Sequence, residues 1–281
     1  INSVALNPSR EEVAFTDRAA VYVKSAGKLP KALPSGRSDG ASHPAQPNFN
    51  QVLFQSPNVI IASGVEPLLT VWTRRDDAEW AIRTIALPGD PVPTGRGVAI
   101  SASGALLAVE VRNGEAASVM LCPLRGDTQW SCPTSKTGGL SLAAKLPSKP
   151  TDKDCASAGS EVHVAMSGSE HLVAVSAGIE VFDLRNREQP RFYSGHRGDV
   201  NSLDFSPDET ALVASSQFYD VDIWNLAGGK PRDINHHGSP YVTSAKFSPS
   251  GKSIVSVSDD NSLIVTDVAS GQLVTKLDYR S

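Results

Sequence analysis

Short runs of alternating apolar and polar residues, separated by turn-forming residues, recur along the whole chain. The clearest copies are residues 200–225 and 242–267. Each has an alternating run, a Ser-Pro turn, a second apolar run, a polar turn and a third alternating run. Alternation with a period of two, rich in β-branched residues, is typical of antiparallel strands. No segment combines a helical period with helix caps, so the pattern predicts an all-β chain with almost no helix.

The same pattern occurs six times. The last apolar residue before each first turn marks a repeat, and these anchors are Leu6, Leu53, Ile100, Met166, Phe205 and Phe247. The first turns, residues 7–10, 55–58, 101–104, 167–170, 206–209 and 248–251, are rich in Ser, Asn, Asp, Pro and Gly. These residues supply the side-chain caps and backbone angles of a tight reversal. A unit of three or four strands buries its faces only against neighbours, which favours a β-propeller or a sandwich.

The repeats resemble those of the WD-repeat β-propeller family, whose frame runs from a Gly-His pair to a Trp-Asp pair. The fifth repeat matches this frame through Gly195-His196, Val200, Phe205-Ser206-Pro207 and Ile223-Trp224-Asn225. The sixth matches through His237, Val242, Phe247-Ser248-Pro249, Asp260 and Thr266-Asp267. In the second repeat, Trp72 follows Leu53 at the same interval as Trp224 follows Phe205. The resemblance implies a β-propeller of four-stranded antiparallel blades.

On this basis we expect a single WD-repeat-like domain over residues 1–281, with a long loop over 134–160. Its six blades are expected at about 1–40, 48–88, 95–135, 160–193, 198–235 and 240–281. Ile1 aligns with the start of an innermost strand, so each blade is predicted to be contiguous, with no strand exchanged between the chain ends. A seventh blade, the usual number in the family, would have to come from sequence outside this chain. A first residue other than Met indicates a processed chain or a piece of a longer one.

The family braces each blade with a hydrogen-bonded His, Ser/Thr, Asp and Trp, and this chain departs from that set. The fifth repeat has His196 and Trp224, but Phe218 stands six residues before the Trp, where the family has Asp. The sixth has His237 and Asp260, but Thr266 replaces the Trp. A partly satisfied buried polar network is worse than an apolar core. We therefore expect these blades to rely on packing instead.

Composition narrows the classes of partner. The chain has 26 Lys and Arg against 30 Asp and Glu, a net charge of −4, and only 6% aromatic residues. No basic excess is present to neutralise a phosphate backbone, so no nucleic-acid partner is predicted. No apolar run approaches the roughly 18 residues of a membrane-spanning helix, so no membrane insertion is expected.

The three cysteines do not by themselves decide the cellular compartment of the protein. Cys122 and Cys132 bracket a predicted hairpin and could face each other. The favoured interpretation is two free thiols in a cytoplasmic protein, whereas a Cys122–Cys132 disulfide would indicate an oxidising compartment. Cys155 lies in a polar segment with no evident partner.

Candidates for catalysis and for metal binding are few. His236 and His237 are adjacent, so on a strand they point to opposite faces, and no third ligand stands at metal-binding spacing. An enzyme of this fold would place ionisable side chains from the innermost strands in a central channel. The predicted innermost strands contain only four such residues, Glu161, His163, Asp204 and Lys246. We therefore predict no enzymatic activity, no cofactor and no metal. The alternative is a propeller enzyme or small-ligand binder that uses the channel.

The sequence thus favours a non-catalytic scaffold or sensor module for protein partners, within a larger polypeptide or complex. Segments 34–48, 87–96 and 134–160 are predicted loops, and the family resemblance implies that they share one face with the turns between second and third strands. There Phe218 and Tyr219 replace a polar turn, and exposed aromatic side chains often anchor partners. The predicted partner-binding residues are Phe218, Tyr219, Arg197, His196, His237, Asp260, Lys145, Lys149 and Lys153.

Overall fold

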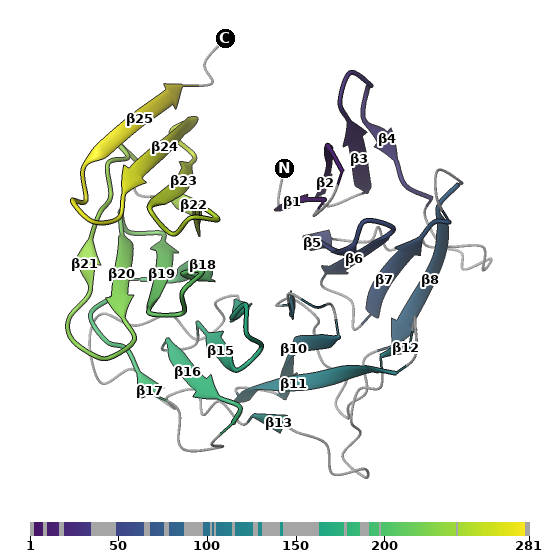
Figure 1. Cartoon of the computed structure of the whole chain (residues 1–281), viewed down its shortest axis with the longest axis horizontal. Coiled ribbons are helices and arrows are strands. Elements are labelled where there is room, and N and C mark those ends of the chain that lie inside the picture. Colours follow the sequence, from purple (N-terminus) through teal and green to yellow (C-terminus); the bar gives the residue numbers. More distant parts are fainter. Residues whose placement is uncertain are drawn as a thin grey trace. The chain divides into compact units, whose positions relative to one another are not determined.

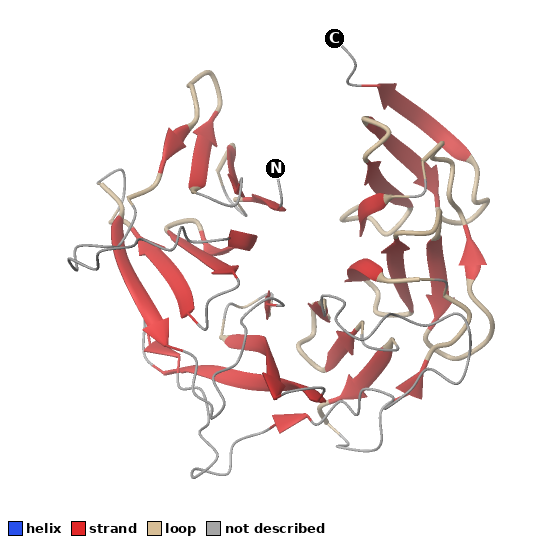
Figure 2. Ribbon diagram, turned by 180° about the vertical axis from the view of Figure 1, so that it is seen from behind, coloured by secondary structure: helices blue, strands red, loops and turns tan. Residues whose placement is uncertain are grey.

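Every regular element in the structure is a strand (Figures 1 and 2). The computed structural model describes residues 3–7, 10–16, 20–34, 49–64, 68–75, 79–86, 98–101, 103, 105–113, 116–125, 129–130, 141–142, 163–176, 179–185, 191–196, 198–239 and 241–278. Within these ranges there is no helix, and six antiparallel sheets each hold four consecutive strands along their main path. The predicted fold class, all-β with six four-stranded blades of the β-propeller type, is confirmed.

The chain divides into two compact units, and each is described by itself. The first, residues 1–113 and 120–141, carries the first two blades and most of the third, whose β11 begins in the second unit. The first blade comprises β1 (Ser3–Leu6), β2 (Glu12–Thr16), β3 (Val21–Ser25) and β4 (Lys31–Ala32). The second comprises β5 (Phe49–Ser56), β6 (Val59–Gly64), β7 (Leu68–Thr73) and β8 (Ala81–Ala86). The third comprises β9 (Val98–Ile100), β10 (Leu106–Asn113), β11 (Ala116–Arg125) and β12 (Gln129–Trp130).

The second unit, residues 114–119 and 142–281, carries the other three blades. The fourth blade comprises β14 (Val164–Met166), β15 (Leu172–Val175), β16 (Glu180–Asp183) and β17 (Arg191–Phe192). The fifth comprises β18 (Val200–Phe205), β19 (Ala211–Ser216), β20 (Val221–Asn225) and β21 (Arg232–Asp233). The sixth comprises β22 (Val242–Phe247), β23 (Ser253–Ser258), β24 (Ser262–Asp267) and β25 (Leu273–Asp278).

One short strand departs from the predicted plan. β13 (Ser141–Leu142) pairs with β11 as a fifth strand of the third sheet. It falls inside the segment 134–160 that the sequence predicts as a loop. The other residues of that segment, and the predicted loops 35–48 and 87–96, lie outside the described residues.

Four of the six predicted first turns, those of the third to sixth repeats, have the same hydrogen bond. A serine hydroxyl accepts the backbone N–H five residues later at 2.9–3.2 Å, and the pairs are Ser101 with Leu106, Ser167 with Leu172, Ser206 with Ala211, and Ser248 with Ser253. This bond satisfies an amide that the reversal would otherwise leave unpaired. The repeated serine therefore explains why these four reversals fall at the positions predicted from the pattern.

The core lies between neighbouring blades. In the second unit one apolar cluster joins the fourth and fifth blades and includes Leu203, Phe205, Leu212 and Trp224. The opposite face of the fifth blade packs on the sixth through a second cluster that includes Val213, Ile223, Val242 and Ile254. The first four residues of β20 are all buried because both faces of this blade are covered. Successive side chains of a strand point to opposite faces, so burial on both faces removes the alternation.

The two aligned tryptophans occupy equivalent positions. Trp72 and Trp224 stand on the third strands of their blades and are almost completely buried. The indole N–H of Trp72 donates to the Pro34 carbonyl at 2.9 Å, and that of Trp224 donates to the Ser194 carbonyl at 3.1 Å. Each indole therefore ties its blade to the chain segment that leads into it.

Candidate partner-binding surface

The turn between β19 and β20 exposes two aromatic side chains side by side. Phe218 is 58% exposed and Tyr219 is 48% exposed. Ser216 fixes this turn, because its hydroxyl accepts the backbone N–H of Phe218 at 3.0 Å and that of Asp220 at 3.2 Å. The backbone N–H of Ser216 also donates to the Asp220 carbonyl at 3.1 Å. The rings therefore project from a closed, hydrogen-bonded turn.

The backbone beneath the two rings is strained. Tyr219 has a φ of 68°, in the left-handed region that bulky residues rarely adopt. Gly198, with a φ of 75°, lies directly against Phe218, since a Cβ there would stand 1.9 Å from Cδ2 of the ring. Such strain costs about 1–3 kcal/mol and clusters at functional sites. The strained turn is thus a candidate for function on structural grounds as well as on sequence grounds.

A third exposed ring joins this turn from the sixth blade. Tyr241, just before β22, is 44% exposed, and its hydroxyl donates to Oε1 of Gln217 at 3.1 Å. The backbone N–H of Gln217 in turn donates to the Asp199 carbonyl at 3.2 Å. We call Phe218, Tyr219 and Tyr241 the aromatic surface. Sequence reasoning missed Tyr241 because its link to Gln217 spans two blades.

The other predicted partner-binding residues lie elsewhere. His196 and His237 are buried, and both bond within their own blades as described below. Asp260 is mostly buried and accepts the backbone N–H of Gly238 at 3.0 Å. Arg197, Lys145, Lys149 and Lys153 lie outside the described residues. Of the nine, only Phe218 and Tyr219 are exposed in the part of the chain that the structure describes.

In the sixth blade, His237 is the centre of a polar brace. Its Nε2 lies 2.9 Å from the Ser256 hydroxyl and its Nδ1 lies 2.9 Å from the Ser262 hydroxyl, which donates to Asp260 at 2.6 Å. Burial lowers the pKa of His237, so the ring is neutral at pH 7 and both hydroxyl contacts are satisfied. The prediction that this blade relies on packing in place of a polar brace was wrong. Of the family's four brace residues, only the tryptophan is absent, because Thr266 stands at its position.

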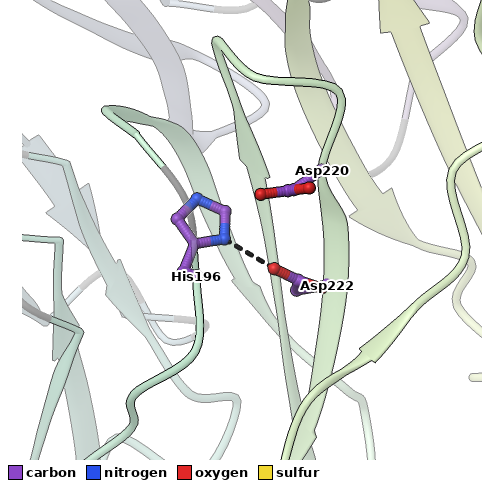
Figure 3. A group of neighbouring side chains, drawn as sticks. All are labelled: His196, Asp220 and Asp222. Atoms are coloured by element: carbon purple, nitrogen blue, oxygen red, sulfur yellow. Dashed lines mark hydrogen bonds and ion pairs between the residues drawn. The ribbon is translucent and has the colours of Figure 1, made fainter. Parts of the chain in front are cut away.

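In the fifth blade, the histidine of the brace bonds to a different acid from the one expected for the family. His196 Nδ1 lies 2.8 Å from Oδ2 of Asp222, an acid two residues before Trp224, and not at the position of Phe218 (Figure 3). The His196 ring also contacts the Trp224 ring, with centroids 5.7 Å apart. Burial raises the pKa of Asp222 in spite of the opposing hydrogen bond with His196. Sequence reasoning missed Asp222 because it lies four residues after position 218, where the family's acid is expected.

One atom of this second brace has no partner. His196 Nε2 is buried and makes no hydrogen bond among the described residues. In the sixth blade the corresponding nitrogen is bonded to Ser256, which pairs across the strands with Ala245. The equivalent position in the fifth blade, opposite Leu203, is Ala214. The loss of one hydroxyl therefore explains the unpaired nitrogen.

His196, Asp220 and Asp222 are the described residues best placed to hold a metal ion. One ligand atom from each lies within 4.8 Å of the others, and all three residues are buried (Figure 3). Figure 3 shows His196 Nε2 directed away from the two carboxylates, with Nδ1 already bonded to Asp222. The arrangement fits a hydrogen-bonded brace within the blade.

The residues predicted for a central channel are engaged with one another. Lys246 Nζ lies 3.2 Å from Oδ1 of Asp204 and donates to the Leu203 carbonyl at 2.9 Å. The desolvated ring of His163, with the positive charge of Lys246 adding to the effect, has a pKa lowered to about 4. Glu161 lies outside the described residues. Asp204 and Lys246 therefore act as a link between β18 and β22.

Cys122 is disulfide-bonded. The favoured expectation of free thiols was therefore wrong for this residue, which lies buried on β11. Cys132 and Cys155 both lie outside the described residues. In the part of the chain that the structure describes, there is no helix long and apolar enough to cross a bilayer.

Comparison with known proteins finds a family match in two of the repeats. The family described as "WD domain, G-beta repeat" matches residues 187–220 and 229–267, which contain β18, β19 and β22–β24. The fifth and sixth repeats of the chain thus match WD repeats. Apoptotic protease-activating factor 1 of Mus musculus is 34% identical over 101 residues, 35% of this chain and 8% of that protein. Small ribosomal subunit protein RACK1y of Oryza sativa subsp. japonica is 33% identical over 86 residues, 30% of this chain and 26% of that protein.

A further WD-repeat relative is the guanine nucleotide-binding protein subunit beta of Oryza sativa subsp. indica. It is 37% identical over 65 residues, which are 23% of this chain and 17% of that protein. The matches thus cover about a quarter or less of the lengths of these relatives. The two family-matched WD repeats are the ones whose turns carry the aromatic surface.

Proposed function

We propose that this WD-repeat protein is a non-catalytic protein-interaction scaffold, and that the aromatic surface is where a protein partner binds. The observation that carries the proposal is the strained turn, in which Ser216 and Gly198 hold Phe218 and Tyr219 exposed above a rigid blade. Aromatic side chains give large contact areas at low entropic cost and are enriched in binding hot spots. A pre-ordered turn also reduces the entropy lost on binding.

Two further observations support the proposal. The names of two relatives describe components of assemblies, a small ribosomal subunit protein and a subunit of a guanine nucleotide-binding protein. In addition, the two blades beneath the aromatic surface are joined by hydrogen bonds between their first strands. The backbone N–H of Ala245 donates to the Ser202 hydroxyl at 2.9 Å, and that of Phe247 donates to Asp204 at 2.8 Å. The aromatic surface is therefore mounted on a cross-linked pair of blades, whether the chain acts alone or within a larger polypeptide.

Affinity purification with matched variants tests the proposal. The Phe218→Ala/Tyr219→Ala variant removes both rings of the turn, and Phe192→Ala removes an equally exposed ring on β17 of the fourth blade. We expect the physiological partner to bind the double variant at least about tenfold more weakly, because hot-spot aromatics contribute 2 kcal/mol or more. Phe192→Ala is expected to bind as the wild type does. Equal dissociation constants for the wild type and the double variant would disprove the role of the surface.

A further inference from the structure

An exposed carboxylate stands beside the aromatic surface. Asp259, in the turn between β23 and β24, is exposed, and its backbone N–H donates to the Tyr241 carbonyl at 3.1 Å. The Ser258 hydroxyl donates to the same carbonyl at 2.6 Å. The main chain of Tyr241 is therefore fastened to the turn that carries Asp259.

Asp259 is held in place by only one of its two oxygens. Oδ1 accepts a hydrogen bond from the Ser239 hydroxyl and lies 3.5 Å from that of Ser258. Oδ2 makes no hydrogen bond, and no Lys or Arg pairs with Asp259, among the residues that the structure describes. The side chain is thus a fixed anion with one acceptor oxygen available to a ligand. Asp199, whose carbonyl bonds to Gln217, places a second acidic residue next to the turn that carries Phe218 and Tyr219.

The carboxylate and the aromatic rings together favour a partner that presents a cationic side chain next to an apolar one. The faces of tyrosine rings attract Arg and Lys cations, and a neighbouring carboxylate adds a charge-assisted hydrogen bond. Phe218 offers an apolar ring with no hydrogen-bonding atom. An acidic partner would meet the charges of Asp259 and Asp199 and be repelled.

We infer that the partner segment bound by the aromatic surface presents an Arg or Lys to Asp259 and the tyrosine rings, beside an apolar side chain that packs on Phe218. This inference rests on the proposed function and specifies its ligand: a basic and apolar peptide segment.

Peptide selection tests this inference. A random peptide library displayed on phage is selected on the immobilised 281-residue chain and counter-selected on Phe218→Ala/Tyr219→Ala. Enriched peptides are then synthesised, and their affinities are measured by fluorescence anisotropy for the wild type, Asp259→Asn and Asp233→Asn. Asp259→Asn keeps the Oδ1 acceptor and removes the charge. Asp233→Asn is the matched control, because Asp233 is also exposed and also accepts a local hydrogen bond, but it lies on β21. Unfolding temperatures confirm that each variant is folded.

We expect the enriched peptides to carry Arg or Lys close to an apolar residue. Asp259→Asn should weaken them about fivefold and Asp233→Asn less than about twofold, with the difference shrinking as salt is added. Peptides that depend on the aromatic pair but lack basic residues, or that bind Asp259→Asn as tightly as the wild type, would overturn the inference and leave the proposed function standing. A selection that yields no peptide dependent on the aromatic pair would overturn both.

Discussion

Glu180 offers a sharp test of the electrostatic reasoning. It stands on β16, paired with Val175 and Phe192, at the register position that Asp222 occupies in the fifth blade. Its side chain is 1% exposed, and neither carboxylate oxygen has a hydrogen-bond partner among the described residues. Burial raises the pKa of Glu180 from 4.5 to about 7. The perturbation we choose is Glu180→Leu, which removes the charge and both unpaired oxygens while keeping a similar volume.

The expected effect depends on pH in a defined direction. Between pH 4.5 and about 7 the folded protein holds a proton on Glu180 that the unfolded chain has released, so the free energy of unfolding falls as the pH rises. One pKa unit corresponds to 1.36 kcal/mol, so the wild type loses about 3 kcal/mol over this interval. Glu180→Leu has no such proton. Relative to the wild type, the variant should therefore gain about 3 kcal/mol of stability between pH 4.5 and pH 8.

Urea unfolding at a series of pH values measures this gain. The difference in free energy of unfolding between Glu180→Leu and the wild type is followed by fluorescence and circular dichroism. Because only the pH dependence of the difference is interpreted, packing changes introduced by leucine cancel. Asp183→Asn is a suitable control, since Arg185 holds the pKa of Asp183 at about 2 and no change is expected between pH 5 and pH 8. A Glu180→Leu difference that stays constant over this range would refute the burial argument.

Three further predictions follow from the braces, the strained turn and the disulfide. Ala214→Ser should give His196 Nε2 a hydroxyl partner and raise the free energy of unfolding by about 1 kcal/mol, as urea unfolding would show; equal or lower stability would contradict the assigned equivalence. Tyr219→Gly should relieve the left-handed strain and stabilise the fold by about 1 kcal/mol while weakening partner binding, whereas Tyr241→Gly, which relieves no such strain, should destabilise the fold. Cys122→Ala should lower the free energy of unfolding by about 2–4 kcal/mol, and a reducing agent should do the same to the wild type. Alkylation of Cys122 without prior reduction would instead support the cytoplasmic location that the sequence favours.

The sequence predicts those features that depend on neighbours close in the chain. Four of the six first turns were predictable because a serine bonds an amide five residues later, and the strands were predictable because apolar residues alternate. Trp72 and Trp224 were found because they stand at a fixed interval after their anchors. In each case the information is local, so it survives the divergence of the repeats.

The missed features depend on contacts between strands. His196 pairs with Asp222, 26 residues away, because the register of β20 brings that acid to the histidine. The brace of His237 uses Ser256 and Ser262, which look like ordinary polar residues of alternating strands. Tyr241 joins the aromatic surface from a different blade. A partner across a strand cannot be chosen from spacing alone when several serines and acids alternate along it.

The two tied tryptophans give the protein built-in optical reporters. Trp72 belongs to the first compact unit and Trp224 to the second, and each indole is buried with its N–H bonded to a carbonyl. Loss of either tie exposes an indole to water and shifts its emission to longer wavelengths. Replacing the other tryptophans with phenylalanine would give two single-tryptophan proteins, one for each unit. Their emission curves in denaturant would then record the melting of each half of the chain separately.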